Sequence, residues 1–207
     1  MKILLVDDHS IVRAGLRGLL ATRPRTELLE AATGEDALTL VRDTRPDLVI
    51  LDLNLPGIGG LELLRRLLAG DRTARVLVLS MHAEPLYAAR AMEAGARGYA
   101  SKNIAPEELL RAVQKVAEGG RYIENDIAQE LAMQTVSAAS PLGQLADRDL
   151  EILRYLAEGR SMTDIAGALS LSYKTVANAC SQIKTKLGVA RTADLIRVAI
   201  EMGLAAG

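Results

Sequence analysis

Residues 2–8 read KILLVDD and residues 47–52 read DLVILD, two apolar runs that each end in aspartate. Runs of this length, followed by stretches with helical spacing, predict buried strands of a parallel sheet. In an open sheet of this type, ligands bind in the crevice at the carboxyl ends of the strands. The sequence therefore predicts an acidic site at one edge of a sheet, formed by Asp7, Asp8 and Asp52.

The first 120 residues alternate between strand and helix patterns. The expected strands are short apolar runs: Ile3–Asp7, Glu27–Ala31, Leu48–Asp52, Val76–Ser80 and Gly98–Ser101. The expected helices follow them: His9–Ala21, Gly34–Thr44, Gly60–Ala69, Glu84–Ala94 and Pro106–Glu118. This alternation predicts an α/β domain over residues 1–120, with a doubly wound, five-stranded parallel sheet.

The pattern changes after residue 120. Residues 121–142 are expected to be a linker, with a helix over Asn125–Val136 and a flexible Ser- and Ala-rich end. Residues 143–207 carry no strand pattern, and short amphipathic helices are expected there: Asp147–Glu158, Met162–Leu169, Ser172–Leu187 and Ala193–Met202. The sequence therefore predicts a small all-α four-helix domain after the linker.

Composition is that of an ordinary soluble globular protein, since the net charge is −1 and 49% of the residues are hydrophobic. No run reaches the roughly 20 apolar residues of a membrane helix, and the N-terminus does not resemble a signal peptide. Cys180 is the only cysteine, so no internal disulfide forms, which fits a reducing cytoplasm. Phe and Trp are absent, which disfavours aromatic stacking on single-stranded nucleic acid.

The strand ends supply the residue types that phosphoryl transfer to a carboxylate needs. Asp52 is the candidate nucleophile, since a carboxylate can attack phosphorus once a cation neutralises the approaching charges. Asp7 and Asp8 offer the hard oxygen ligands that Mg²⁺ prefers, and Asn54 lies near the same edge. Two further residues can hold phosphoryl oxygens by charge or hydrogen bond: Lys102 and Ser80.

Other interpretations of these residues exist. Each acid alone is also explained as a strand-end residue or a helix N-cap, but the full set at successive strand ends favours chemistry. A Mg²⁺-dependent phosphatase with Asp52 as nucleophile is one alternative, although no second general acid follows at a useful spacing. A phosphorylation-independent DNA-binding or protein-interaction regulator with a vestigial pocket is another.

The segments KILLVDDH, VILDLNLPGIGGLELL, VLVLSMHAE and GARGYASKN resemble the receiver domain of two-component response regulators. The resemblance implies that Asp52 receives a phosphoryl group from the phosphohistidine of a sensor histidine kinase. It also implies that Asp7, Asp8 and the carbonyl of Asn54 surround Mg²⁺, the cofactor of the reaction.

The same resemblance assigns roles to residues of the fourth and fifth strands. Ser80 and Tyr99 match the hydroxyl and aromatic pair that reorients on phosphorylation, and Lys102 matches the lysine of the pocket. Asn103 stands where members of the family often carry Asp or Pro, which is a local departure from the pattern.

A second constellation lies in LADRDLEILRYLAEGRSMTDIAGALSLSYKTVANACSQIKTKLGV, where short helices and a tight turn precede a longer helix, as in a helix-turn-helix. No Asp or Glu occurs from Ile165 to Ala193, so this segment does not repel phosphates. The candidate DNA-contacting residues lie on the longer helix: Lys174, Thr175, Asn178, Ser181, Gln182, Lys184 and Lys186. Asn178 and Gln182 are residue types that can hydrogen-bond to the base edge of adenine. The alternative to a DNA-binding domain is a helical bundle with a solvated basic face.

This second segment resembles the LuxR-type DNA-binding domain. Small residues, Ala177, Ala179 and Cys180, stand where family members often carry larger ones. Together the two resemblances imply a cytoplasmic response regulator of the NarL/FixJ-like family rather than a turnover enzyme. Phosphorylation is expected to control formation of a homodimer and its binding to double-stranded DNA, with RNA polymerase as a further candidate partner and no membrane contact.

Overall fold

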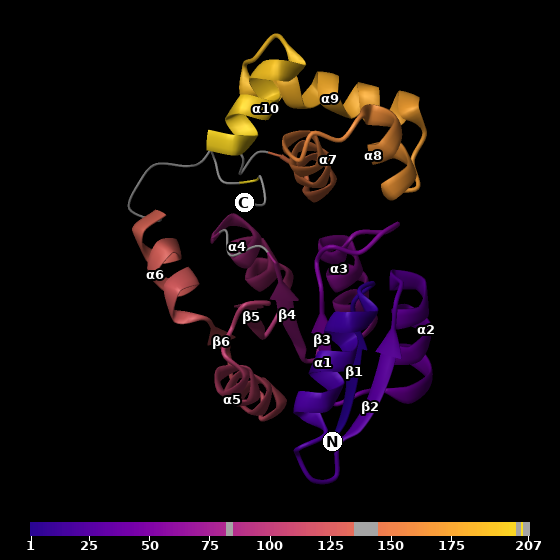
Figure 1. The fold of residues 1–207 in the computed structure, drawn as a ribbon, viewed down its shortest axis with the longest axis vertical. Helices are drawn as coiled ribbons and strands as arrows, with labels where there is room; N and C mark the ends of the chain where they lie inside the picture. Colours follow the sequence, from indigo (N-terminus) through magenta and orange to yellow (C-terminus); the bar gives the residue numbers. More distant parts are fainter. Residues whose placement is uncertain (82–84, 135–144, 202–203, 205–207) are drawn as a thin grey trace. The chain divides into compact units, whose positions relative to one another are not determined.

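Alternating strands and helices form the first part of the chain, and helices alone form the second (Figure 1). The computed structural model describes residues 1–81, 85–134, 145–201 and 204. The chain divides into two units, Met1–Ala132 and Met133–Gly207, and each is considered by itself.

The first unit is built on one parallel sheet. Its strands are β1 (Lys2–Val6), β2 (Glu27–Ala31), β3 (Leu48–Leu51), β4 (Val76–Ser80), β5 (Gly98–Ser101) and β6 (Tyr122–Ile123). They lie in the order β2-β1-β3-β4-β5-β6. The residues of β3 and β4 are all buried, as expected for inner strands covered on both faces. The central apolar runs of the sequence are therefore the centre of the sheet.

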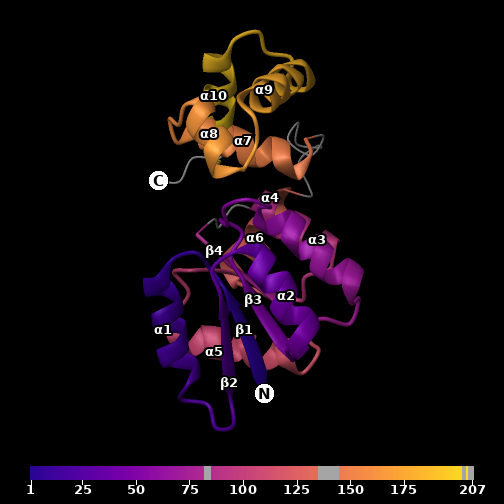
Figure 2. The same cartoon turned by 90° about the vertical axis from the view of Figure 1, so that its right-hand side faces the viewer.

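Helices cover both faces of this sheet (Figure 2). One face carries α1 (Ser10–Leu20) and α5 (Pro106–Ala117), and the other carries α2 (Gly34–Thr44), α3 (Gly60–Gly70) and α4 (Pro85–Ala94). Leu16 and Leu20 of α1 and Val113 of α5 pack in one cluster with alternate strand residues such as Ile3 and Ile50. The predicted doubly wound α/β class is confirmed.

The loop between β3 and α3 is closed at its base by a close approach of the backbone. The N–H of Gly60 donates to the carbonyl of Leu53 at 3.1 Å. A Cβ atom at Gly60 would lie 2.2 Å from the Cα of Leu53, so a side chain cannot be placed there without moving the backbone. Glycine at this position is therefore required by the contact.

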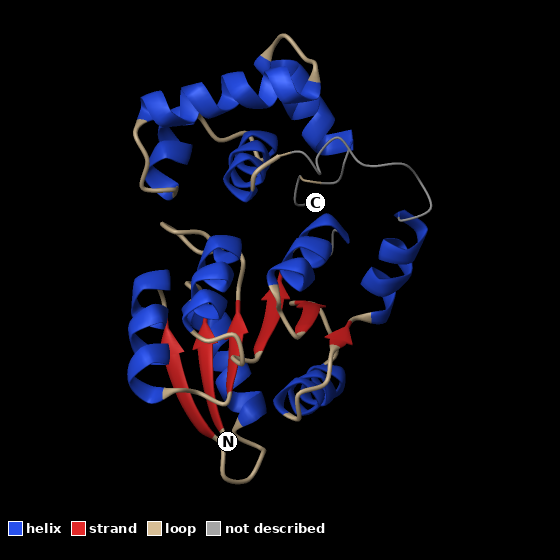
Figure 3. Ribbon diagram, turned by 180° about the vertical axis from the view of Figure 1, so that it is seen from behind, coloured by secondary structure: helices blue, strands red, loops and turns tan. Residues whose placement is uncertain are grey.

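The prediction of five strands is wrong by one, because the sheet has a sixth strand. The N–H of Tyr122 donates to Arg97 O at 3.0 Å, and Tyr99 pairs in register with Ile123. A two-residue strand is too short to show an alternating pattern. It leads directly into α6 (Asn125–Gln134), as Figure 3 shows, and the predicted end of this helix at Val136 lies outside the described residues.

The second unit contains four described helices: α7 (Asp147–Ala157), α8 (Met162–Ala168), α9 (Tyr173–Leu187) and α10 (Thr192–Glu201). Ser161 caps α8 and Ser172 caps α9, each accepting a backbone N–H three residues ahead. Gly188 ends α9 in the left-handed conformation with φ of 69°. The predicted all-α unit is confirmed. Among the helices that the structure describes, none combines the length and hydropathy that crossing a bilayer requires.

Candidate functional site

The predicted acidic residues meet at the carboxyl ends of β1 and β3. These strands are neighbours with Val6 opposite Leu51, and the N–H of Asp52 donates to the carbonyl of Val6 at 2.9 Å. Asp7 is 2% exposed and Asp52 is 1% exposed, whereas the side chain of Asp8 is 34% exposed. Parallel pairing therefore brings together carboxylates that lie far apart in the sequence.

Lys102 reaches the same place from the end of β5. Its Nζ atom lies 2.6 Å from Oδ2 of Asp7 and 2.6 Å from Oδ2 of Asp52. The lysine side chain is only 5% exposed, so its charge is held in a pocket of low solvent access. One ammonium group thus bridges two carboxylates.

The ionisation of this pair follows from burial and charge. Burial raises the pKa of the Asp52 carboxyl above its usual range, and the Lys102 ammonium and the Asn54 N–H offset this only in part. Burial acts to lower the pKa of the Lys102 ammonium, but the carboxylates of Asp52 and Asp7 outweigh it, so that pKa is raised. Lys102 therefore remains a cation at neutral pH.

The remaining predicted residues of the pocket flank Asp52. The N–H of Asn54 donates to Oδ1 of Asp52 at 3.0 Å, which leaves Oδ2 for Lys102. Ser80 ends β4, is fully buried, and its carbonyl accepts the N–H of Lys102 at 2.7 Å. Tyr99 is fully buried on the neighbouring strand β5, opposite Val78 in register.

Two residues outside the predicted set also lie at this edge. Nδ1 of His9 lies 2.7 Å from Oδ1 of Asp8, and its exposed ring belongs to a group with Asp7, Asp8 and Asp52 whose potential ligand atoms lie within 4.8 Å of one another. Arg13 of α1 donates to the carbonyl of Asp7 at 2.6 Å. No pattern in the sequence pointed to Arg13, because its contact depends on how α1 packs beside β1.

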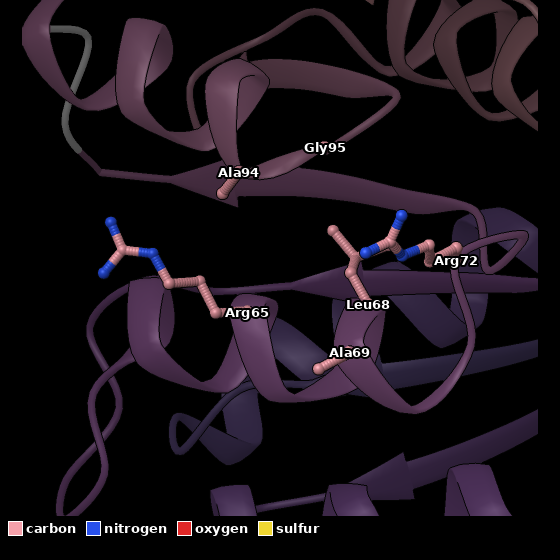
Figure 4. Close-up of a pocket in the computed structure, with 6 residues that line it drawn as sticks. All are labelled: Arg65, Leu68, Ala69, Arg72, Ala94 and Gly95. Atoms are coloured by element: carbon pink, nitrogen blue, oxygen red, sulfur yellow. The ribbon is translucent and has the colours of Figure 1, made fainter.

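A separate groove lies between α3 and the end of α4, away from the acidic pocket (Figure 4). It has a volume of about 380 Å³ and is lined by Arg65, Leu68, Ala69, Arg72, Ala94 and Gly95. Figure 4 shows Arg65 and Arg72 at its two ends with Leu68 between them. None of the predicted site residues lines this groove.

In the second unit, α9 separates core residues from exposed ones. Val176, Cys180 and Ile183 are buried, and burial raises the pKa of the Cys180 thiol, which disfavours the reactive thiolate. The exposed polar residues of the helix include most of the predicted DNA contacts: Lys174, Thr175, Asn178, Ser181, Gln182 and Lys186. Lys184 is partly buried.

Two of these exposed side chains already have partners inside the unit. The hydroxyl groups of Thr175 and Ser172 lie 2.8 Å apart at the start of α9. Nζ of Lys186 lies 2.6 Å from Oδ2 of Asp149, which belongs to α7. Neither Ser172 nor Asp149 was predicted to hold a candidate DNA contact.

Comparison with known sequences accounts for both units. Residues 3–114 match the family described as response regulator receiver domain, and residues 143–199 match bacterial regulatory proteins of the luxR family. The chain belongs to the two-component response regulators. Its relatives include response regulator UvrY of Escherichia coli strain K12, which is 37% identical over 99% of this chain and 95% of the relative. Transcriptional activator protein ExaE of Pseudomonas putida is 42% identical over 99% and 98%.

Solved structures agree with this assignment. A LuxR-family response regulator from Aurantimonas is 44% identical with a TM-score of 0.63, over 66% of this chain and 98% of that chain. RcsB of Salmonella typhimurium, at 23% identity, supports the fold with a TM-score of 0.76 over 98% of both chains. This response regulator thus joins a receiver domain to a LuxR-type DNA-binding domain that regulates transcription. Its relatives are regulators rather than enzymes, so the phosphatase interpretation receives no support.

Proposed function

We propose that a phosphoryl group transferred to Asp52 from a sensor histidine kinase controls how this response regulator dimerises and binds DNA. In this proposal residues 1–120 act as the receiver, 121–142 as the linker and 143–207 as the DNA-binding domain. The observation that carries the proposal is the position of Asp52, with Oδ2 on the Lys102 ammonium and Oδ1 on the Asn54 N–H.

Phosphoryl transfer at this site has a simple balance. A carboxylate oxygen of Asp52 forms a bond to phosphorus, the bond between phosphorus and the kinase imidazole breaks, and the imidazole leaves with that electron pair. Lys102 supplies a positive charge for the phosphoryl oxygens. The hydroxyl of Ser80 then donates to a phosphoryl oxygen, and Tyr99 reorients beside it.

The donor set at this edge fits a hard divalent cation. Carboxylate oxygens of Asp7, Asp8 and Asp52 lie in the group whose atoms are within 4.8 Å of one another, and Mg²⁺ prefers such ligands. We infer that these three residues and the carbonyl of Asn54 hold Mg²⁺. When bound, the ion neutralises negative charge between the carboxylate and the incoming phosphoryl group.

The second unit is proposed to bind double-stranded DNA through α9, as a homodimer, because two small DNA-binding domains gain specificity as a pair. Lys174 and Lys184 are the proposed phosphate contacts. Asn178, Ser181 and Gln182 are the proposed base contacts. The remaining two candidates, Thr175 and Lys186, contribute only if they leave or share the partners they have within the unit.

Two further partners and a location complete the proposal. The sensor histidine kinase is implied by the receiver domain, and RNA polymerase is the expected partner at a promoter. Both the phosphoryl donor and the DNA are met in the cytoplasm, which is the proposed site of action.

Intact-mass measurement after incubation with acetyl phosphate and Mg²⁺ tests the acceptor. We expect one added phosphoryl group in the wild type and none in Asp52→Asn. Asp43→Asn, an exposed aspartate on α2, is the matched control and should be phosphorylated as the wild type is. Phosphorylation that survives in Asp52→Asn would overturn the assignment.

A further inference from the structure

Glu124, which follows β6, binds the end of β5 to the start of α6. Its N–H donates to the carbonyl of Tyr99 at 3.1 Å, and its own carbonyl accepts the N–H of Ala128 at 2.9 Å. Its carboxylate accepts the N–H of Ser101 at 2.6 Å through Oε2, and the Ser101 hydroxyl lies 3.5 Å from Oε1. Glu124 therefore contacts β5 through both its backbone and its side chain, and α6 through its backbone.

The carboxylate takes the place of a missing ladder acceptor. If β6 continued alongside β5, the N–H of Ser101 would meet a backbone carbonyl, but the chain turns into α6 and the Glu124 carbonyl is already used there. Ser101 is only 7% exposed, so an unpartnered N–H would be costly. A charged acceptor at 2.6 Å makes this a strong hydrogen bond.

Ser101 is also the residue next to Lys102. Its hydroxyl oxygen accepts the N–H of Asn103 at 3.2 Å, so Ser101 fixes the backbone on the far side of Lys102 as well. The Lys102 ammonium lies 2.6 Å from Oδ2 of Asp52. The chain of contacts from Asp52 to Glu124 is thus one ion pair, one peptide bond and one short hydrogen bond.

At its other end, Glu124 precedes the helix that leads out of the receiver unit. Ile127 of α6 is 2% exposed, and the unit ends at Ala132 within the same helix. Figure 3 shows β6 as the edge strand that runs directly into α6. Among the described residues, Glu124 is the last before this helix whose backbone hydrogen-bonds to the sheet.

We propose that Glu124 is a positioning residue that couples Lys102 to α6, so that the state of Asp52 is transmitted to the linker along the edge of the sheet. The inference rests on Asp52 as the phosphoacceptor. When a phosphoryl group is attached, Lys102 exchanges the Asp52 carboxylate for phosphoryl oxygens. The shift of its backbone moves Ser101, and the hydrogen bonds of Ser101 to the Glu124 carboxylate pass that shift to the first turn of α6.

A purely structural role for Glu124 makes a different prediction. If the carboxylate only completed the ladder, its removal would loosen α6 equally in the phosphorylated and the unphosphorylated protein. If it couples the two sites, its removal reduces the difference between the two states. Coupling is measured as a difference between the phosphorylated and the unphosphorylated state. Hydrogen exchange must therefore be measured in both states of each variant.

The test uses the full-length protein with and without acetyl phosphate and Mg²⁺. Intact mass gives the extent of phosphorylation, and amide hydrogen exchange follows residues 122–134. In the wild type we expect phosphorylation to change exchange in this segment. In Glu124→Ala we expect the same extent of phosphorylation, with the change in the exchange ratio between states reduced by roughly 2- to 30-fold. Glu124→Gln retains an acceptor for the Ser101 N–H and should keep most of the response.

Glu130→Ala is the matched control, because Glu130 is an exposed acid on the same helix. It should respond as the wild type does. Ser101→Ala removes the hydroxyl bonds but keeps the N–H bond to Glu124, so its response should be intermediate, and it decides the matter if Glu124→Ala does not fold.

Several outcomes overturn the coupling. An undiminished difference between states in Glu124→Ala, or in Ser101→Ala if Glu124→Ala is unfolded, would do so. So would a phosphorylated wild type with unchanged exchange in this segment. A wild type that gains no phosphoryl group instead refutes Asp52 as the acceptor, and the coupling falls with it, so the two failures are distinguished by the mass measurement.

Discussion

Two lysines of this protein hold aspartates at the same distance in two different regions. Lys102 lies 2.6 Å from Asp52 in the receiver pocket, and Lys186 lies 2.6 Å from Asp149 in the DNA-binding unit. The side chain of Lys102 is 5% exposed and touches a second carboxylate, whereas that of Lys186 is 37% exposed. Equal distances are therefore expected to carry unequal energies. The Asp149 side chain is only 10% exposed, but Lys186 stays open to water that screens its charge, whereas all three charged groups of the Lys102 cluster are buried.

The largest effect is expected at the buried lysine. Lys102→Ala leaves two buried carboxylates without their counter-ion, which should lower the free energy of unfolding by about 3 kcal/mol in the absence of Mg²⁺. Added Mg²⁺ should restore part of this loss, since it neutralises the same carboxylates. Urea unfolding of both proteins in EDTA and in Mg²⁺ measures the effect. Arg42→Ala, which breaks an exposed pair with Asp43, is the control and should change little.

A loss below about 1 kcal/mol in Lys102→Ala would mean that the pocket is screened like a surface, and the contrast with Lys186 would disappear. The raised pKa of Lys102 determines whether its contribution to the free energy of unfolding rises or falls with pH. Its contribution is fully present below the unfolded-state pKa of about 10.4 and is lost as pH rises through the higher folded-state pKa.

The next effect concerns base reading by α9. Asn178→Ala or Gln182→Ala should narrow the gap in binding free energy between selected DNA sites and random DNA by about 1–3 kcal/mol, if a bidentate base contact is lost. Titrations of the phosphorylated full-length protein against both kinds of DNA measure this gap. Gln129→Ala, at an exposed position of α6, should leave it unchanged. An equal loss of affinity for both DNAs would show that these residues do not read bases.

A smaller effect sharpens the comparison between lysines within one helix. Lys184→Ala should reduce the slope of log affinity against log salt by about 0.9, as for one lost phosphate contact. Lys186→Ala should reduce it less, because Asp149 already neutralises that ammonium in the unbound protein. The loss of stability in Lys186→Ala should be smaller than that in Lys102→Ala, because Lys186 is 37% exposed and holds one carboxylate rather than two. Equal slopes for the two variants would mean that Lys186 leaves Asp149 on binding.

The smallest effect is the pH dependence that Asp52 contributes. Its pKa is raised in the folded protein, so the unfolded chain loses this proton first and stability falls as pH rises from about 3.9 through the folded-state pKa. Metal-free Asp52→Asn should therefore gain stability over the wild type at pH 7, and this advantage should shrink toward pH 3. Unfolding curves of both proteins at the two pH values check the sign. An advantage that grows at low pH would contradict it.

The two regions also differ in how far the sequence could predict them. The buried runs define β1 and β3, and parallel pairing then places Asp7 beside Asp52 without further information. The contacts of Lys186 with Asp149 and of Ser101 with Glu124 carried no comparable signal. Each joins elements whose packing depends on many side chains at once, and an acidic residue looks the same in sequence whether or not it has a partner.

The sixth strand escaped prediction for a related reason. Tyr122 and Ile123 pair with β5 after the chain turns at the end of α5, where Gly119 has a φ of 88° and the N–H of Gly120 donates to the carbonyl of Lys115. A dipeptide has no periodicity that would distinguish a strand from a turn. The position of Glu124, and with it the proposed coupling, therefore became visible only from the fold.

The closed base of the loop between Leu53 and Gly60 has a consequence for how this regulator can change over evolutionary time. The Gly60 N–H donates to the Leu53 carbonyl, and the lack of a Cβ at Gly60 allows the two backbones to approach closely. Both ends of the loop that carries Pro56 and Ile58 are therefore held in place. Lengthening such a loop costs little once its ends are fixed. Changes of sequence in this loop can therefore be accommodated beside the Asp52 carboxylate while Asp52 itself stays in place.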